Sequence, residues 1–267
     1  MPLPPALAEF ANHHRPQPAP GIEIITTSRY QITLQPDFPI PGPNNVSWVR
    51  CRPDEAGEVI GEARATIAPH HLPVMWTLDP ETEPADFADH LARFSVHPDP
   101  HGAETAVMVL PIDAELSPPA IPGLEIRDAL ADLATFRSSD AVAFEAFRSE
   151  ALPDDAESVA KQERRRLNMR AAGRRFQLLA TVDGEPAGTG GISVFADGAI
   201  INGGSVRPKF RGRGVYRALV AARLEIARGA GVSGLVVWGG DMSAPILARL
   251  GFEKVGWRRF YLDTSTA

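Results

Sequence analysis

The sequence predicts a layered α/β protein made of two unequal halves. Three observations lead to this prediction. Apolar patterns typical of strands alternate with patterns typical of helices along most of the chain. A proline-rich segment at residues 117–123 interrupts the alternation. Residue types also divide there, since all seven histidines lie in the first 101 residues and 21 of the 25 prolines precede position 123.

The first half predicts a flexible tail and a small α/β unit. Residues 1–20 are rich in proline and offer little to pack. The expected strands lie at 22–34, 46–49, 73–78 and 105–110, and the expected helices at 54–67 and 85–94.

The second half predicts a longer unit with a central hairpin, because Asp183-Gly184 joins two apolar runs as a turn. The expected strands lie at 124–127, 176–182, 187–195, 199–206, 234–238, 252–257 and 260–262. The expected helices lie at 130–147, 156–172, 214–228 and 244–250. The chain is thus divided into a tail (1–20), a small domain (21–116), a linker (117–123) and a larger domain (124–267).

Composition excludes several classes of protein. The chain has 267 residues, 44% hydrophobic and 22% charged, with a net charge of −6, as in soluble globular proteins. No apolar run approaches the roughly 18 residues of a membrane helix, and the N-terminus lacks the features of a signal peptide. The single cysteine, Cys51, excludes intrachain disulfides, so we expect a cytoplasmic protein. Without histidine, residues 123–267 cannot supply a Ser-His-Asp triad or a histidine-ligated zinc site, and no metal is expected.

A glycine-rich basic loop carries the clearest chemical signal. It lies between the strand that ends near Val206 and the helix that begins near Gly214. Gly212 and Gly214 let main-chain N–H groups approach a ligand, and the first N–H groups of a helix are unpaired. Arg211 and Arg213 add positive charge to the helix dipole, so the loop predicts a phosphate or pyrophosphate site. A solvated Arg-Gly turn at a helix start is the plainer alternative.

The second half resembles the GNAT superfamily of acyl-CoA-dependent N-acyltransferases. The family signature is Arg/Gln-x-x-Gly-x-Gly/Ala after a strand that ends in Val-x-Pro, and this chain has Val206, Pro208, Arg211 and Gly214 at those places. The order of elements also matches, down to Gly-Phe at 251–252 after the short helix. The resemblance implies a mixed, mainly antiparallel sheet flanked by helices. It is preceded here by a smaller degenerate α/β domain of related topology, since residues 91–96 and 247–252 are similar.

The resemblance also implies a co-substrate and the residues that bind it. Acetyl-CoA would be bound by the main-chain N–H groups at 211–216 through its pyrophosphate, and by the strand edge at 205–206 through its pantetheine arm. A main-chain N–H near Val206 would stabilise the oxyanion. The cofactor-binding residues expected on this basis are Ser205, Val206, Arg207, Arg211, Gly212, Arg213, Gly214, Val215 and Tyr216.

The sequence departs from the family where the catalytic groups usually stand. Tyr216 replaces a glycine or alanine, and its ring is expected to lie along the helix surface. Leu247 occupies the place of a frequent tyrosine acid, and Gly240 that of a frequent asparagine. Asp241 and Ser243 are therefore the candidate catalytic residues, although both are also good helix N-cap types. A tyrosine acid would have to be one of the chain's three tyrosines, Tyr30, Tyr216 and Tyr261. A base acting through water, or none beyond solvent, stays open.

The corresponding loop of the first half, residues 49–55, has no glycine pair and places Asp54 and Glu55 at a helix start, where they would repel a pyrophosphate. We expect that half to pack against the second and to help shape the acceptor pocket. A basic run at 161–175 is interpreted as a solvated helix face with acidic partners in the first half, because no aromatic residues interleave it.

The sequence thus predicts an N-acetyltransferase that moves an acetyl group from acetyl-CoA to a primary amine of a small molecule or peptide. The alternative, favoured by Leu247 and Gly240, is a non-catalytic acyl-CoA-binding sensor or structural protein. A nucleic-acid module using the arginine-rich surfaces is a third interpretation, although we do not expect nucleic acid or a membrane as partner. A monomer or a homodimer is expected.

Overall fold

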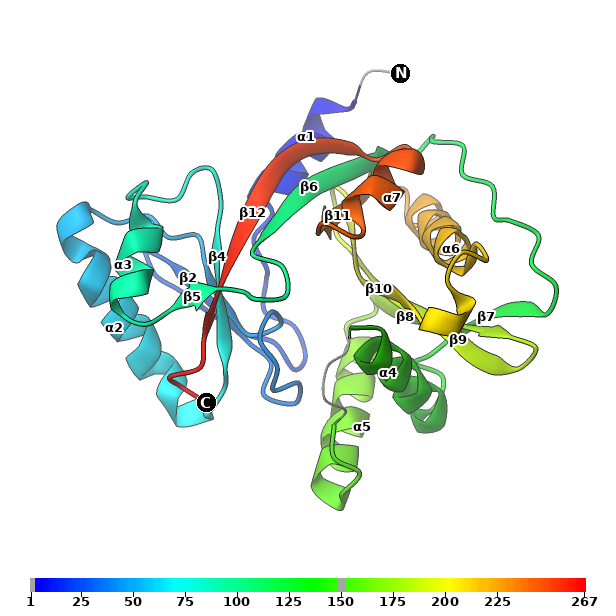
Figure 1. The fold of residues 1–267 in the computed structure, drawn as a ribbon, viewed down its shortest axis with the longest axis horizontal. Helices are drawn as coiled ribbons and strands as arrows, with labels where there is room; N and C mark the ends of the chain where they lie inside the picture. Colours follow the sequence, from blue (N-terminus) through cyan, green and yellow to red (C-terminus); the bar gives the residue numbers. More distant parts are fainter. Residues whose placement is uncertain (1–2, 148–151) are drawn as a thin grey trace. The chain divides into compact units, whose positions relative to one another are not determined.

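The computed structural model describes residues 3–147 and 152–267. They form two compact units, coloured by sequence in Figure 1, and each unit draws on separate stretches of the chain. The first unit lies within Met1–His14, Met108–Val237 and Ile246–Val255, and the second within Arg15–Val107, Trp238–Pro245 and Gly256–Ala267. The units do not follow the predicted division, because β6 (Glu104–Pro111) and β12 (Glu253–Asp263) each contribute residues to both.

The sheet of the first unit has the strand order β6, β11, β10, β9, β8, β7. Strands β7 to β10 pair antiparallel, whereas β10 and β11 pair parallel, so the sheet is mixed. The strands of this sheet other than β6 span Leu124–Asp128 (β7), Arg175–Val182 (β8), Glu185–Val194 (β9), Ala199–Val206 (β10) and Gly234–Gly239 (β11).

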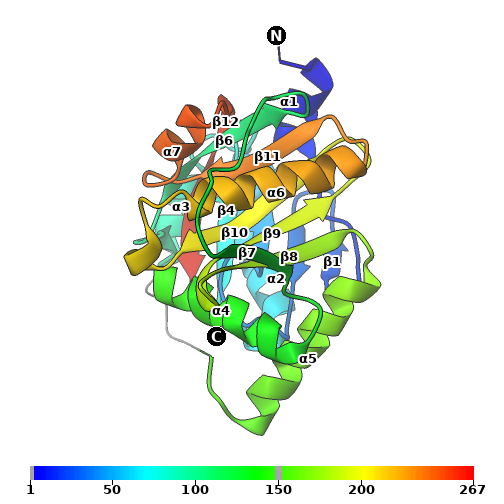
Figure 2. The same cartoon turned by 90° about the vertical axis from the view of Figure 1, so that its right-hand side faces the viewer.

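Two helices cover opposite faces of this sheet. A Cβ added at Gly188 of β9 would meet Val215 and Leu219 of α6 (Val215–Gly229), which crosses the strands in Figure 2. The next residue, Thr189, shares a hydrogen bond with Ser139 of α4 (Leu133–Phe147). Because successive residues of a strand point to opposite faces, α6 and α4 lie on different sides of β9. Helix α5 (Ala156–Ala171) packs beside α4, and α7 spans Ala244–Arg249.

Residues predicted to belong to a flexible tail form helix α1 (Pro5–His13) of the first unit. Leu7, Phe10 and Ala11 share one face through i, i+3 and i+4 spacing, and all three are buried. Gly198 and Gly234 make room for them, since an added Cβ would lie 2.7 Å from Phe10 Cδ1 and 2.6 Å from Leu7 Cδ2 respectively. The apolar face therefore outweighs the proline content that suggested disorder.

The second unit is a smaller layered α/β structure with the strand order β1, β2, β3, β4, β12. Its core gathers around Trp76 and Phe87, both fully buried. Its strands are β1 Glu23–Thr26, β2 Gln31–Leu34, β3 Asn45–Ser47, β4 Val74–Leu78 and the short β5 His97–Pro98, which pairs with β12. Its helices are η1 Pro53–Glu55, α2 Ala56–Ile67, η2 Ala68–His70 and α3 Phe87–Arg93.

Three boundaries differ from the prediction for local reasons. The extended segment at 22–34 is a hairpin, because Thr27 caps a turn by accepting from the amides of Arg29 and Tyr30. Helix α4 starts at Leu133 since Asp132 accepts from the amide of Thr135 as an N-cap does. The two expected closing strands are one strand, β12. Within residues 3–147 and 152–267, no helix is long and apolar enough to span a membrane.

Candidate cofactor site

The predicted loop joins β10 to α6 through one short turn. After Val206 the chain makes the 3₁₀ turn η3 (Pro208–Phe210) and then enters the left-handed region at Gly212 (φ +74°) and Gly214 (φ +87°). Gly214 is the N-cap of α6 and has no side chain to cap the helix. Two glycines are needed here because L-residues rarely adopt these angles.

The loop leaves its main-chain N–H groups available. The amides of Phe210 and Arg211 donate to Arg207 and Pro208, but those of Gly212 to Gly214 find no acceptor of good geometry within the described chain. The first amides of α6 follow directly, and they lack intrahelical partners by the geometry of any helix start. Together they form a row of donors at the positive end of a helix dipole, an arrangement that suits a phosphate or diphosphate.

The basic side chains of the loop have different partners. Arg207 pairs with Glu145 at 2.9 Å, and Lys209 pairs with Glu185. Arg211 donates from Nε to the carbonyl of Val206 and from Nη2 to that of Ala146, 3.2 Å each, so it ties the loop to α4. Arg213 is exposed and lies 5.4 Å from the ring centroid of Phe210. Of the predicted arginines, Arg213 is thus the one best placed to meet an incoming anion.

The edge of β10 opens just before the loop. Strands β10 and β11 pair only at Ala199–Leu235 and Ile200–Val236 among the described residues. Beyond these pairs, β10 carries a bulge between Asn202 and Ser205, with Gly203 at φ +56°. Ser205 and Val206 therefore lie on a strand segment that no longer pairs with β11, as an extended ligand would require.

Ser205 itself carries an unsatisfied polar atom. Its side chain is buried, and Oγ meets no hydrogen-bond partner among the described residues. Buried hydroxyls normally have a partner, so a water molecule or a ligand group is expected to reach this atom. Val206 packs in a cluster with Val215 of α6, and its carbonyl accepts from Arg211, which leaves its main-chain N–H as the group available for binding.

The ring of Tyr216, expected to lie along the surface of the helix, lies on the face of α6 that packs against the sheet. It packs against the apolar cluster of the first unit, and a Cβ added at Gly204 of β10 would lie 3.1 Å from its Cε2. Its phenol interacts with Arg223, two turns further along α6. Arg223 is fully buried, and the sequence analysis did not single it out. The sequence could have indicated that residue 223 is buried, because it lies four residues after Leu219 and therefore on the apolar face of the helix.

The candidate catalytic residues Asp241 and Ser243 follow β11 in a turn that belongs to the second unit. The amides of Ser243 and Ala244 donate to the carbonyl of Gly240 at 2.9 and 2.8 Å, and Ser243 Oγ lies 3.3 Å from the same oxygen. Ser243 thus closes the turn before α7, and Asp241 is exposed. Leu247 is fully buried, so the family's usual position for an acid is occupied by an apolar core side chain.

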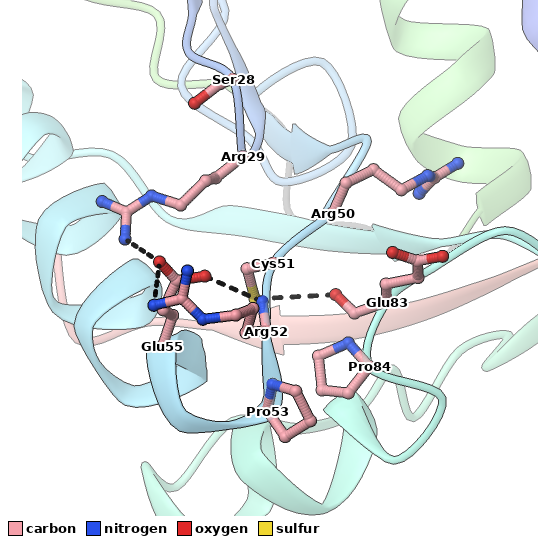
Figure 3. A pocket seen from close by; sticks show the side chains of 9 residues that line it. All are labelled: Ser28, Arg29, Arg50, Cys51, Arg52, Pro53, Glu55, Glu83 and Pro84. Atoms are coloured by element: carbon pink, nitrogen blue, oxygen red, sulfur yellow. Dashed lines mark hydrogen bonds and ion pairs between the residues drawn. The ribbon is translucent and has the colours of Figure 1, made fainter.

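In the second unit, the segment that corresponds to the glycine loop has amides that other groups of the protein already bind. A cavity of about 610 Å³ lies there, lined by residues that precede α2 and by Glu83 and Pro84. Figure 3 shows the side chains that line it. The amide of Arg52 donates to the Glu55 carboxylate at 2.9 Å, and that of Cys51 to the carbonyl of Glu83 at 3.1 Å. Glu55 also pairs with the guanidinium of Arg52 at 3.1 Å. Because protein groups already bind these amides, a diphosphate would have to displace a carboxylate.

Arg165, Arg166 and Arg170 of the basic run have partners within the first unit, whereas the sequence led us to expect acidic partners in the first half of the chain. Arg165 pairs with Asp140 of α4, and burial raises the pKa of that carboxyl against the opposing effect of Arg165. Arg166 pairs with Glu163 and donates to the carbonyl of Leu130, which also accepts from Arg170. These arginines hold α5 onto the unit and offer little to a nucleic acid.

Comparison with known proteins agrees with this geometry. Residues 141–252 match the family described as "Acetyltransferase (GNAT) family". No curated protein matches the chain significantly.

Among solved structures, a GCN5-related N-acetyltransferase from Kribbella flavida superposes with a TM-score of 0.63 at 17% identity, covering 91% of this chain and 90% of that one. A protein of unknown function from Staphylococcus epidermidis superposes with a TM-score of 0.65 at 14% identity, covering 92% of this chain and 95% of that one. A tandem GNAT protein from the clavulanic acid biosynthesis pathway superposes with a TM-score of 0.59 at 17% identity, covering 92% of this chain and 84% of that one. At these identities the similarity establishes the fold.

The family match spans the loop, α6 and β11, and the structural matches extend over the N-terminal half. Residues 141–252 are therefore a GNAT-family acetyltransferase domain, in a chain whose GNAT fold includes an N-terminal partner half.

Proposed function

We propose that this protein is an acetyl-CoA-dependent N-acetyltransferase that acts on a primary amine of a small molecule or peptide. The observation that carries the proposal is the row of unpaired amides at Gly212 to Gly214, which continues into the start of α6. When bound, acetyl-CoA supplies an activated acetyl thioester. The amides of the loop would hold its diphosphate, and Arg213 would add a full charge beside them.

The β10 edge would orient the acyl donor. Its main-chain groups at Ser205 and Val206 are free of β11, and the amide in this segment would stabilise negative charge on the thioester oxygen. A lysine-like amine with a pKa near 10.4 is uncharged only about once in 10³ molecules at pH 7, so loss of its proton has to accompany attack. Asp241 and Ser243 remain the proposed sources of polar assistance.

A second function is favoured by one observation. Leu247 is fully buried and Gly240 has no side chain, so the usual family positions offer no proton donor. A protein with the cofactor loop but without catalysis would serve as an acyl-CoA sensor. Tight binding of acetyl-CoA without turnover on any amine would identify this function.

Calorimetric titration with acetyl-CoA and a thiol-release assay against a panel of amines test the proposal. Arg213→Glu brings a carboxylate to the loop and should weaken binding about tenfold or more, equivalent to about 1.4 kcal/mol. Arg174→Glu makes the same charge change at an exposed site before β8 and should bind as the wild type does. Equal affinities of the two variants, or no binding by the wild type, would refute the placement of the site.

A further inference from the structure

Tyr216 and Arg223 form a polar pair on the face of α6 that packs against β9 and β10. The strands make room for the pair with glycines. A Cβ at Gly190 of β9 would lie 2.9 Å from Arg223 Cζ, and one at Gly204 of β10 would lie 3.2 Å from Arg223 Nη2. The pair thus lies directly against the bulged segment of β10, the strand whose free edge carries Ser205 and Val206.

The guanidinium of Arg223 is a buried cation without an acidic partner in the described parts of the chain. Nε donates to the carbonyl of Leu219 at 2.9 Å and Nη1 to that of Gly191 at 3.4 Å. Nη2 meets no acceptor of good geometry, although the phenol of Tyr216 is close enough to interact with it. Burial lowers the pKa of Arg223 to about 10, so the group remains charged at neutral pH. Such a cation favours any negative charge that forms beside it.

The other tyrosines lie in the second unit and have other contacts. The Tyr30 hydroxyl is 3.5 Å from Glu62, and Tyr261 is a β12 residue paired with Trp76. Tyr216 is the tyrosine that belongs to the unit with the loop and the open strand edge. Burial raises the pKa of its phenol, against the opposing effect of Arg223. Among the described residues of α6, β9 and β10, Arg223 is the titratable group that acts on this phenol, which therefore carries its proton at neutral pH.

We propose that Tyr216 is the proton donor to the thiolate that leaves in acetyl transfer, and that Arg223 is the positioning residue that holds the phenol and stabilises its anion. The inference rests on the proposed function. As the amine nitrogen bonds to the acetyl carbon, the carbon–sulfur bond breaks and sulfur takes both electrons. The phenol gives its proton to that sulfur, and the resulting phenolate regains a proton from water, which receives the one lost by the amine. Protons and electrons balance without another reactant.

Binding alone tests the contact with sulfur. The probes are coenzyme A and desulfo-coenzyme A, which lacks the thiol, measured by calorimetry at pH 9. A phenol beside the sulfur should make the wild type prefer coenzyme A by about tenfold, and Tyr216→Phe should reduce this preference to about twofold or less. The control variant Tyr261→Phe removes a phenolic hydroxyl from the second unit and should keep the wild-type preference for coenzyme A. An unchanged preference in Tyr216→Phe would overturn the proposal even if both ligands bind, whereas failure of the wild type to bind either would overturn the proposed function.

Turnover and titration test the roles separately. Tyr216→Phe should lower kcat by about 100-fold or more while acetyl-CoA affinity stays within about threefold. In Arg223→Met, the ultraviolet titration of Tyr216 should move to higher pH, because the neighbouring cation is lost, and Arg223→Lys should restore it in part. A kcat of Tyr216→Phe within threefold of the wild type, or a Tyr216 titration that Arg223→Met leaves in place, would contradict the assignment.

Discussion

Gly212 and Gly214 have similar backbone angles but different surroundings, and alanine substitutions should separate the two effects. Both residues lie in the left-handed region, where an alanine costs about 1 kcal/mol relative to glycine. A Cβ at Gly212 has nothing within 4 Å, whereas one at Gly214 would lie 2.7 Å from Pro119 Cγ and 3.3 Å from Pro119 Cβ. Crowding of this kind costs a further ~1–3 kcal/mol.

We therefore expect Gly212→Ala to lower the free energy of unfolding by about 1 kcal/mol and Gly214→Ala by about 2–4 kcal/mol. Urea unfolding followed by circular dichroism measures both values, and the slope of each transition shows whether the two-state assumption holds. Equal losses in the two variants would mean that Pro119 does not pack against the N-cap of α6. A larger loss for Gly212→Ala would refute the description of the loop itself.

Two further predictions concern other parts of the chain. If Asp241 and Ser243 assist catalysis, Asp241→Asn and Ser243→Ala should each lower kcat about tenfold or more with little change in acetyl-CoA affinity; wild-type rates in the thiol-release assay would leave them a role in the turn alone. Burial by itself would raise the pKa of Asp263, but hydrogen bonds from Arg64, Ser265 and Trp76 outweigh it and hold the pKa below its ordinary value. The resulting stabilisation is present above about pH 4 and is lost as pH falls through the lowered folded value. Asp263→Asn should therefore reduce the unfolding free energy at pH 7 by about 1–3 kcal/mol and make it less dependent on pH below about 4; an unchanged acid-unfolding profile would contradict this.

The backbone of the glycine loop was predictable because its signal is local. Glycines at fixed places before an amphipathic helix determine backbone angles and free amides whatever surrounds them, and the structure has both at Gly212 and Gly214. The role of Arg211 was not predictable in the same way. Its guanidinium bonds to the carbonyl of Ala146, a residue 65 positions away, and only the packing of α4 brings that carbonyl into reach.

Arg223 and α1 were missed for a related reason. Burying an arginine costs free energy through desolvation of its charge. Its side chain fits here because glycines in β9 and β10 leave space for it, and these glycines are not neighbours of position 223 in the sequence. In α1 the spacing of Leu7, Phe10 and Ala11 was visible, but short helices are stable mainly through packing. The surface that buries them is formed by residues near Phe195 and Gly198, nearly two hundred positions later.

The placement of α1 has a practical consequence for dissecting the protein. A fragment beginning at residue 124 keeps the whole family match, yet it lacks the helix whose Leu7 and Phe10 lie over Gly234 and Gly198. It also lacks the part of β6 that neighbours β11. Such a fragment would leave an apolar hollow and an uncovered strand edge, and would be prone to self-association. Separating the first unit from the second thus requires joining non-adjacent pieces of polypeptide, and a single cut does not suffice.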